Sequence, residues 1–426
     1  MISENKEKRS LLGIALFLLV LFSQWGFVFH VSRYANTLLS NILILFTSFL
    51  FLTFLVTHEK SRKTTIGVWW EIYAIITIVG YIFSFLIVSL LPWVCYFVLI
   101  LYASRCDILK IIPVKLLFWS GVIAMFGIYL QFFFPSLYSA RIESLFINDF
   151  LYDKMEGVID VTEMYGMKGF FHNQGNAAIV LTFGFLIMFY LKADVVPVFL
   201  QRNLIYGILV LIIVFSIFFT GKRTLSLLVV AVPFAVSFLS SKNASKRFLV
   251  LLCILVAFLL IYYIILPYVF ESFNFFFFHR LQETLYDTKS GDINSLTSGR
   301  YYMWDKAIDA WSEHPIFGIG VGKFMDYTRS HTDVHNSYLQ VLCEQGLFGF
   351  AFYLTGLLTI LFYTIRLFDK VKNNIWIQWL KLSLASQLIF LFYSFTGNPH
   401  LDFCMTMMIM SAAITIRINY MCKFQI

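Results

Sequence analysis

Long hydrophobic stretches recur along the whole chain, each near the ~20 residues that one helix needs to cross a bilayer. Polar residues gather between these stretches instead of alternating with apolar ones, so the pattern of a membrane β-barrel is absent. A backbone surrounded by lipid satisfies its own hydrogen bonds best as a helix. The pattern therefore predicts an all-α polytopic membrane protein with about 12 transmembrane helices.

Two long polar segments divide the expected helices into groups. We expect the helices, in chain order, at 11–31, 37–56, 67–90, 93–103, 113–134, 175–191, 204–220, 224–239, 248–270, 347–365, 376–395 and 403–416. Pro92 is expected to separate the third helix from the fourth, because proline cannot donate a helical hydrogen bond. The predicted organisation is therefore residues 1–270 with helices 1–9 and an outer loop at 135–173, a large outer loop at 271–345, and residues 346–426 with helices 10–12.

Composition and charge support this class and give an orientation. Hydrophobic residues make up 60% of the chain and charged residues 13%, whereas soluble domains carry roughly 25% charged residues. Most Lys and Arg residues fall in short loops on the side of the N-terminus, which predicts cytoplasmic termini and outer polar segments. The net charge of +8 is explained by these loops and gives no indication of nucleic-acid binding. The six cysteines show no paired spacing and no metal motif, so we interpret them as packing residues.

The large outer loop contains predicted structure of its own. It is too long for a simple connector. Residues 300–311 predict a helix with Trp304, Ile308 and Trp311 along one face, and a second helix is expected from Asn336. Between them, Gly318, Gly320 and Gly322 allow a sharp turn with close approach of the backbone.

Four basic residues at three places on the expected outer face suggest a chemistry. Lys222 and Arg223 lie in a tight turn between the seventh and eighth helices, where a snorkelling pair is the alternative interpretation. Arg300 heads the first loop helix, and His335 precedes the second; taken singly, each is an ordinary polar residue. Guanidinium groups pair with phosphate oxygens, and an imidazole can take a proton from a hydroxyl group. Together they suggest a pyrophosphate site with a histidine base.

The same residues carry a family resemblance. His335-Asn336, followed after nine residues by Gly346-Leu347-Phe348-Gly349, resembles the signature of the O-antigen ligase and Wzy-type polymerase superfamily. Segments 169–176, 218–224, 298–304 and 314–324 are also similar to that family, although Lys222 stands where its turn usually has serine. The resemblance covers roughly residues 165–365 by motif and the whole chain by topology.

The resemblance implies a GT-C-like glycosyltransferase without metal or other cofactor, in the inner membrane of a bacterium. Its donor would be a glycan on undecaprenyl diphosphate at the periplasmic face. His335 would activate the acceptor hydroxyl, Arg223 and Arg300 would bind the diphosphate, and Lys222 would add a phosphate contact. Supporting candidates on the donor or acceptor side are His172, Asn173, Trp304, Gly318, Gly320, Gly322, Asn336 and Tyr338.

Several functions are compatible with these motifs. We favour polymerisation of lipid-linked repeat units into O-antigen or capsular polysaccharide over ligation of the glycan to lipid A-core, and rank glycosylation of pilins third. A flippase for lipid-linked sugars is the alternative from another class, since ionisable residues inside the membrane mark transport pathways; Glu71 is the clearest such residue. The expected partners are the lipid-linked oligosaccharide and the bilayer, with a chain-length regulator and a flippase as candidates, and no nucleic acid.

Overall fold

The computed structural model describes residues 12–21, 46–47, 49–50, 53, 66–104, 107–143, 166–171, 173–241, 249, 300–329 and 332–424. Within these residues the chain is helical, with no strand. The expected helix at 248–270 and most of the helix at 37–56 lie outside the described residues, as do His172, most of the loop at 135–173 and the large loop before Arg300.

The described residues form two compact units. The first contains the helix Leu12–Leu21, the described residues from 66 to 113, and the described residues from 300 onwards. The second contains the described residues from 114 to 241.

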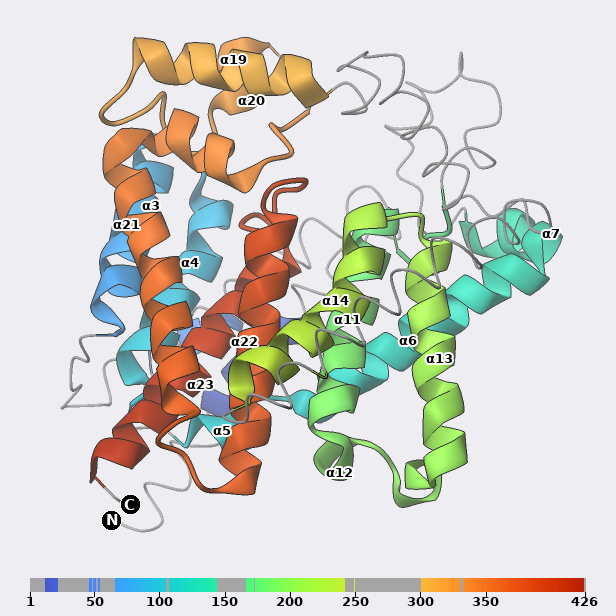
Figure 1. Ribbon diagram of the computed structural model, residues 1–426. Helices are drawn as coiled ribbons and strands as arrows, with labels where there is room; N and C mark the ends of the chain where they lie inside the picture. The colour runs from blue at the N-terminus through green and yellow to red at the C-terminus, as the bar shows by residue number, and fades with distance from the viewer. Residues whose placement is uncertain are drawn as a thin grey trace. The chain divides into compact units, whose positions relative to one another are not determined.

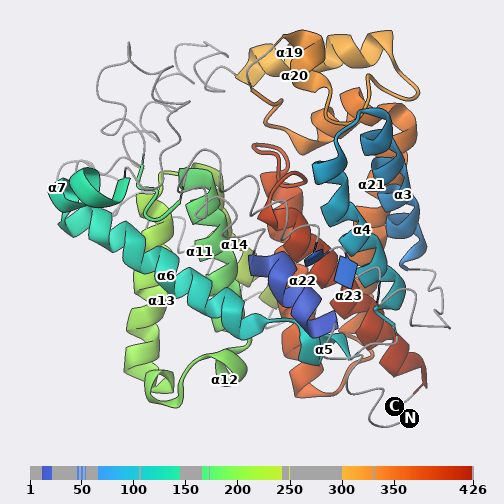
Figure 2. The ribbon, with the colours of Figure 1, turned by 180° about the vertical axis from the view of Figure 1, so that it is seen from behind.

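Helices α21, α22 and α23 form the centre of the first unit, with α3 beside α21 in both views (Figures 1 and 2). Helix α19 lies across the N-terminal end of α21, at the opposite end of this unit from the last turn of α23 (Figure 1). The helices of this unit are α3 (Val68–Phe83), α4 (Ile87–Tyr102), α5 (Ile108–Ile111), α19 (Arg300–Glu313), α20 (Phe324–Thr328), α21 (Ser337–Leu367), α22 (Asn374–Tyr393) and α23 (Phe403–Phe424).

The break between α3 and α4 is not at Pro92, as expected, but seven residues earlier at Phe85. Phe85 has a φ of 57°, which ends α3. The N–H groups of Ser84 and Leu86 donate back to Gly80 O and Tyr81 O, both at 3.0 Å, and so close this helix end. Pro92 lies inside α4, where it removes one backbone donor without ending the helix.

The second unit is built around α11, which is buried on almost all sides. A Cβ atom on Gly121 of α6 would lie 2.8 Å from the Cα of Gly184 of α11, so the two helices are nearly in backbone contact. The elements of this unit are α6 (Val114–Phe133), α7 (Pro135–Leu137), a π-helical turn η1 (Tyr138–Glu143), α11 (Gln174–Tyr190), α12 (Lys192–Val195), a 3₁₀ turn η2 (Val198–Gln201), α13 (Asn203–Phe219) and α14 (Arg223–Ser240).

Ten of the described helices are apolar, which confirms a multi-pass membrane protein. Helices α6, α11, α13, α14 and α22 begin and end within a residue or two of their expected bounds. Five helices have the length and composition to cross a membrane: Val114–Phe133, Arg223–Ser240, Ser337–Leu367, Asn374–Tyr393 and Phe403–Lys423. The total of twelve, and the position of the large loop between the ninth and tenth helices, stay predictions.

Candidate functional site

Helix α21 joins the helix expected from Asn336 to the tenth apolar span, with one interruption at Gly346 (φ 65°, ψ −171°). The segment that follows α19 lies along this interruption and replaces the helical hydrogen bonds lost there. Leu347 N donates to Pro315 O at 2.9 Å and Phe348 N donates to Ile316 O at 3.0 Å. The two glycine-containing motifs, 314–322 and 346–349, are therefore bonded to each other.

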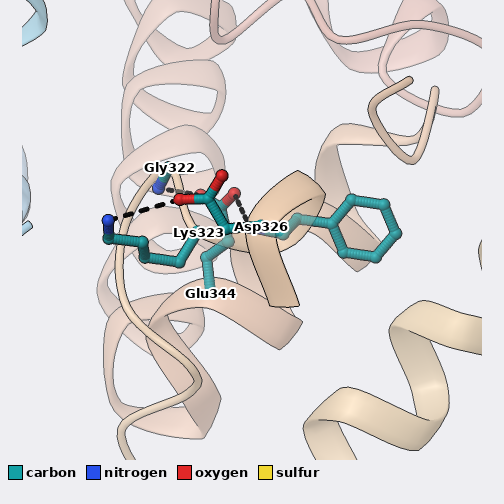
Figure 3. Close-up of polar contacts among 5 residues, drawn as sticks. Gly322, Lys323, Asp326 and Glu344 are labelled. Carbon is teal, nitrogen blue, oxygen red and sulfur yellow. Dashed lines mark hydrogen bonds and ion pairs between the residues drawn. The ribbon is translucent and has the colours of Figure 1, made fainter. Parts of the chain in front are cut away.

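Gly322, at the end of the 318–322 turn, lies against the carboxylate of Glu344, which is almost fully buried (Figure 3). Gly322 N donates to Oε2 at 2.9 Å, and Gln340 Nε2 donates to Oε1, also at 2.9 Å. A buried carboxylate needs such donors. A Cβ atom on Gly318 would lie 2.3 Å from the carbonyl carbon of Glu344. The close approach expected of these glycines is thus made to the backbone and side chain of α21.

Helix α19 covers the N-terminal part of α21 through small residues. Ala307 and Ala310 are buried against Phe324, Val334 and Cys343. Trp304 and Trp311 pack beside this cluster, but Ile308 is 46% exposed. The prediction that Trp304, Ile308 and Trp311 form one apolar face is therefore wrong for Ile308. The alanines allow a close approach on a face rotated away from Ile308.

His335 lies between two firmly held residues. Val334 N donates to Gln340 Oε1 at 3.1 Å, and Trp304 Nε1 donates to Val334 O at 3.1 Å. On the other side, Asn336 Oδ1 accepts from Tyr338 N at 3.0 Å and caps α21. His335 itself is exposed and adopts a φ of 55°, a backbone conformation that costs a non-glycine residue about 1–3 kcal/mol and needs support from its surroundings.

Arg300 and the segment of His335 contact the same turn, the residues 394–400 between α22 and α23. Arg300 Nη1 donates to Thr396 O at 2.8 Å. Ser337 N, two residues after His335, donates to Ser394 O at 2.9 Å and to Gly397 O at 3.1 Å. The structure thus holds Arg300 and the segment of His335 and Asn336 against one turn, and Trp304 bonds to the same segment. Tyr338 reaches α22, where its hydroxyl group donates to Leu391 O at 2.9 Å.

The 394–400 turn has no predicted role from the sequence. A signal was available, because Gly397-Asn398-Pro399 is a turn signature that places His400 between two apolar helices. The side chain of His400 is buried, and burial lowers the pKa of its imidazole to about 3.

In the second unit, Lys222 and Arg223 occupy the tight turn that the sequence predicts between α13 and α14. Met167 N donates to Phe219 O at 2.9 Å, which brings the segment before α11 onto this turn. Asn173 caps α11 by accepting from Asn176 N at 2.9 Å. A Cβ atom on Gly175 would lie 4.0 Å from Lys222 Nζ, so this ammonium group lies beside the first turn of α11.

Basic side chains lie where α11 and α14 begin. The N-terminal end of a helix carries partial positive charge. Lys222 adds a full charge at the start of α11, and Arg223 opens α14. Lys222 is the N-cap residue of α14 and has no side-chain oxygen with which to accept from its first amides.

The predicted site residues are thus divided between the two units: Lys222, Arg223 and Asn173 in one, and the rest of those described in the other. That they face one cavity stays a prediction. Among the described residues, no three His, Cys, Asp or Glu side chains are grouped so that they could hold a metal ion.

Comparison with known proteins bears on this region. Residues 208–354 match the family model described as O-antigen ligase. The match runs from α13 into α21 and includes Arg223, Arg300 and His335. No curated protein matches the chain. The family match confirms the resemblance found in the sequence.

Proposed function

We propose that this protein is a membrane glycosyltransferase, because residues 208–354 match the family model described as O-antigen ligase. It polymerises oligosaccharide repeat units linked to undecaprenyl diphosphate into O-antigen or capsular polysaccharide. The reaction takes place at the outer face of a bacterial inner membrane, with both termini in the cytoplasm. The outer segments at 135–173 and 271–345 contribute the binding surface, and the apolar helices on either side anchor it in the bilayer.

In the proposed reaction, His335 accepts the proton of the acceptor hydroxyl group while the hydroxyl oxygen attacks the anomeric carbon of the donor. The bond from that carbon to the diphosphate oxygen breaks, and its electron pair leaves with the lipid diphosphate. The configuration at the anomeric carbon inverts. Imidazole suits this role because it exchanges protons near neutral pH.

Arg300, Arg223 and Lys222 bind the diphosphate in this proposal. Guanidinium groups stabilise the charge that develops on the leaving oxygen, so the reaction proceeds without a metal ion. The observation that carries the proposal is the convergence of Arg300 and the His335 segment on one turn, at 2.8 Å for Arg300 to Thr396 and 2.9 Å for Ser337 to Ser394. A base and an anion-binding group held on one support are what displacement of a diphosphate requires.

The acceptor distinguishes the alternatives. In a polymerase it is a sugar of another lipid-linked repeat unit, and in a ligase it is a sugar of lipid A-core. A flippase for lipid-linked sugars has no acceptor and needs no base. A chain-length regulator and a flippase are the candidate protein partners of the polymerase.

The test is complementation of a strain that lacks the gene, with the surface polysaccharide separated on a gel. The strain receives the wild type, His335→Ala, or His314→Ala as a matched control, since His314 is also an exposed histidine of the same unit. We expect wild type and His314→Ala to restore long chains and His335→Ala to leave single repeat units.

The deletion strain itself separates a polymerase from a ligase, and the His335→Ala variant tests the transporter. Single repeat units attached to their carrier or to the core indicate a polymerase. Long chains that remain on undecaprenyl diphosphate indicate a ligase. If His335→Ala restores the full ladder of chains, the catalytic proposal fails and the transporter becomes the better explanation.

A further inference from the structure

A second histidine, His400, lies buried beneath the segment that carries His335. Its Nδ1 atom is 2.7 Å from Ser337 Oγ. Ser337 Oγ is also 3.4 Å from Gly397 O, and the main-chain N–H of Ser337 donates to Ser394 O and Gly397 O. The first residue of α21 is therefore bonded to the 394–400 turn through both its main chain and its side chain.

The proton arrangement of this contact follows from the donor count. A serine hydroxyl has one proton to donate. Both contacts of Ser337 Oγ are hydrogen bonds only if the hydroxyl donates to Gly397 O and Nδ1–H of His400 donates to Oγ. His400 Nδ1 is thus the donor in this contact, and burial favours the neutral imidazole, whereas His335 is exposed.

The same turn also orients Arg300, because Thr396 O accepts from Arg300 Nη1 at 2.8 Å. Its other end continues into α23, where Asp402 Oδ1 accepts from Cys404 N at 2.8 Å. The turn thus links the start of α19, the start of α21 and the start of α23.

We infer that His400 is a positioning residue for the proposed glycosyl transfer. Through Ser337 it fixes the backbone that holds His335, whereas Arg300 is held by its own bond to Thr396 of the same turn. This inference rests on the proposed function, but the role of His400 is tested separately from the role of His335.

The reason for a functional effect is geometric. A proton acceptor must meet the acceptor hydroxyl at hydrogen-bond distance, and a displacement of ~1 Å can cost about 100-fold in rate. The backbone of His335 has a φ of 55°, which is maintained by bonds to the neighbouring residues. Loss of the Ser337–His400 bond would loosen one of those supports without removing a group that touches substrate.

The experiment uses the full-length protein in liposomes, with the lipid-linked glycan that accumulates in the deletion strain as donor. The variants are His400→Phe, His400→Asn, His400→Gln, Ser337→Ala and the double variant Ser337→Ala/His400→Phe. His335→Ala is measured alongside. An asparagine amide occupies the place of Nδ1 and can donate to Ser337, whereas a glutamine amide reaches the place of Nε2.

We expect His400→Phe and Ser337→Ala each to lower kcat about 10- to 100-fold, with the KM for the donor changed less than about twofold. His400→Asn should restore most of the activity, and His400→Gln should not. The double variant should lose no more than the worse single variant, because both changes break one bond. Protein level and thermal unfolding are measured for each variant. If His400→Phe does not fold, the role of His400 is judged from His400→Asn, His400→Gln and Ser337→Ala.

Two results would overturn the inference. One is full activity of folded His400→Phe or Ser337→Ala while His335→Ala is inactive. The other is a double variant whose loss equals the product of the single losses. If His335→Ala is active as well, the proposed function itself has failed, which is a distinct outcome.

Discussion

The junction at Gly346 offers the sharpest test of how the site is built. An alanine there would take a backbone conformation that is available almost only to glycine, at a cost of about 1–3 kcal/mol. Its Cβ atom would also lie 2.2 Å from Ile316 O and 2.3 Å from Ile316 C. Both are backbone atoms, so no side-chain rotation can relieve the overlap.

The overlap must therefore separate the 315–320 segment from α21. That movement breaks at least the bonds Leu347 N–Pro315 O and Phe348 N–Ile316 O, each worth about 0.5–1.5 kcal/mol. Added to the backbone strain, the expected loss is about 2–6 kcal/mol. Folded domains are stable by only about 5–15 kcal/mol, so Gly346→Ala should lower the unfolding temperature strongly.

Thermal unfolding in detergent, together with the amount of protein in the membrane, measures this loss. Gly207→Ala is the matched control, because Gly207 lies inside α13 and a Cβ there meets no atom within 4 Å. We expect that control to be neutral or more stable by about 0.5–1 kcal/mol, since alanine favours a helix over glycine. If Gly346→Ala unfolds at the wild-type temperature, the account of the junction is wrong.

Three further predictions concern the surroundings of His335. Arg300→Lys should raise the KM for the lipid-linked donor about 10-fold in the liposome assay. The guanidinium group can donate to Thr396 O and to a phosphate group at the same time, whereas the lysine ammonium group lacks this planar set of donors. An unchanged KM would argue against diphosphate binding by Arg300. Trp304→Phe should cost about 1 kcal/mol of unfolding free energy through loss of the bond to Val334 O, and Trp311→Phe, whose exposed Nε1 bonds to Pro315 O, should cost less. Burial lowers the pKa of His400 from 6.5 to about 3 in the folded protein. As the pH falls below about 6.5, His400 therefore takes up a proton in the unfolded chain but not in the folded protein, and the folded protein becomes less stable relative to the unfolded chain. Relative to His400→Asn, the wild type should lose about 2 kcal/mol of unfolding free energy between about pH 7.5 and about pH 5. The comparison removes the contribution of Asp402, whose pKa is raised to about 7 by burial and which titrates in both proteins. Parallel curves of unfolding free energy against pH would contradict the prediction.

The sequence predicted the parts of this site that depend on local signals. The turn of Lys222 and Arg223 was predictable because two apolar stretches are separated by Thr220 and Gly221. The first loop helix was predictable from its residue types, but its buried face was not. Ala307 and Ala310 carry no strong apolar signal, yet small side chains let α19 approach α21 closely, and Ile308 is left exposed.

The contacts that join distant segments could not be predicted in the same way. Gly318 and Gly346 each indicate a special backbone conformation, but only the structure shows that their segments bond to each other. Ser337 and His400 are 63 residues apart, and neither carries a motif that names the other. A turn between two apolar helices carries no local signal of which loop it supports.

The supports around His335 bear on the choice between an enzyme and a transporter. Its segment is bonded to α19 through Trp304, to α21 through Gln340 and to the 394–400 turn through Ser337. These bonds maintain a backbone conformation that costs free energy in an exposed histidine. A transport pathway needs elements that exchange readily between two arrangements, and such bonding opposes that exchange. A proton acceptor in a displacement reaction needs the opposite, a fixed position relative to the anion-binding groups. The cost borne at His335 is therefore better explained by catalysis than by transport.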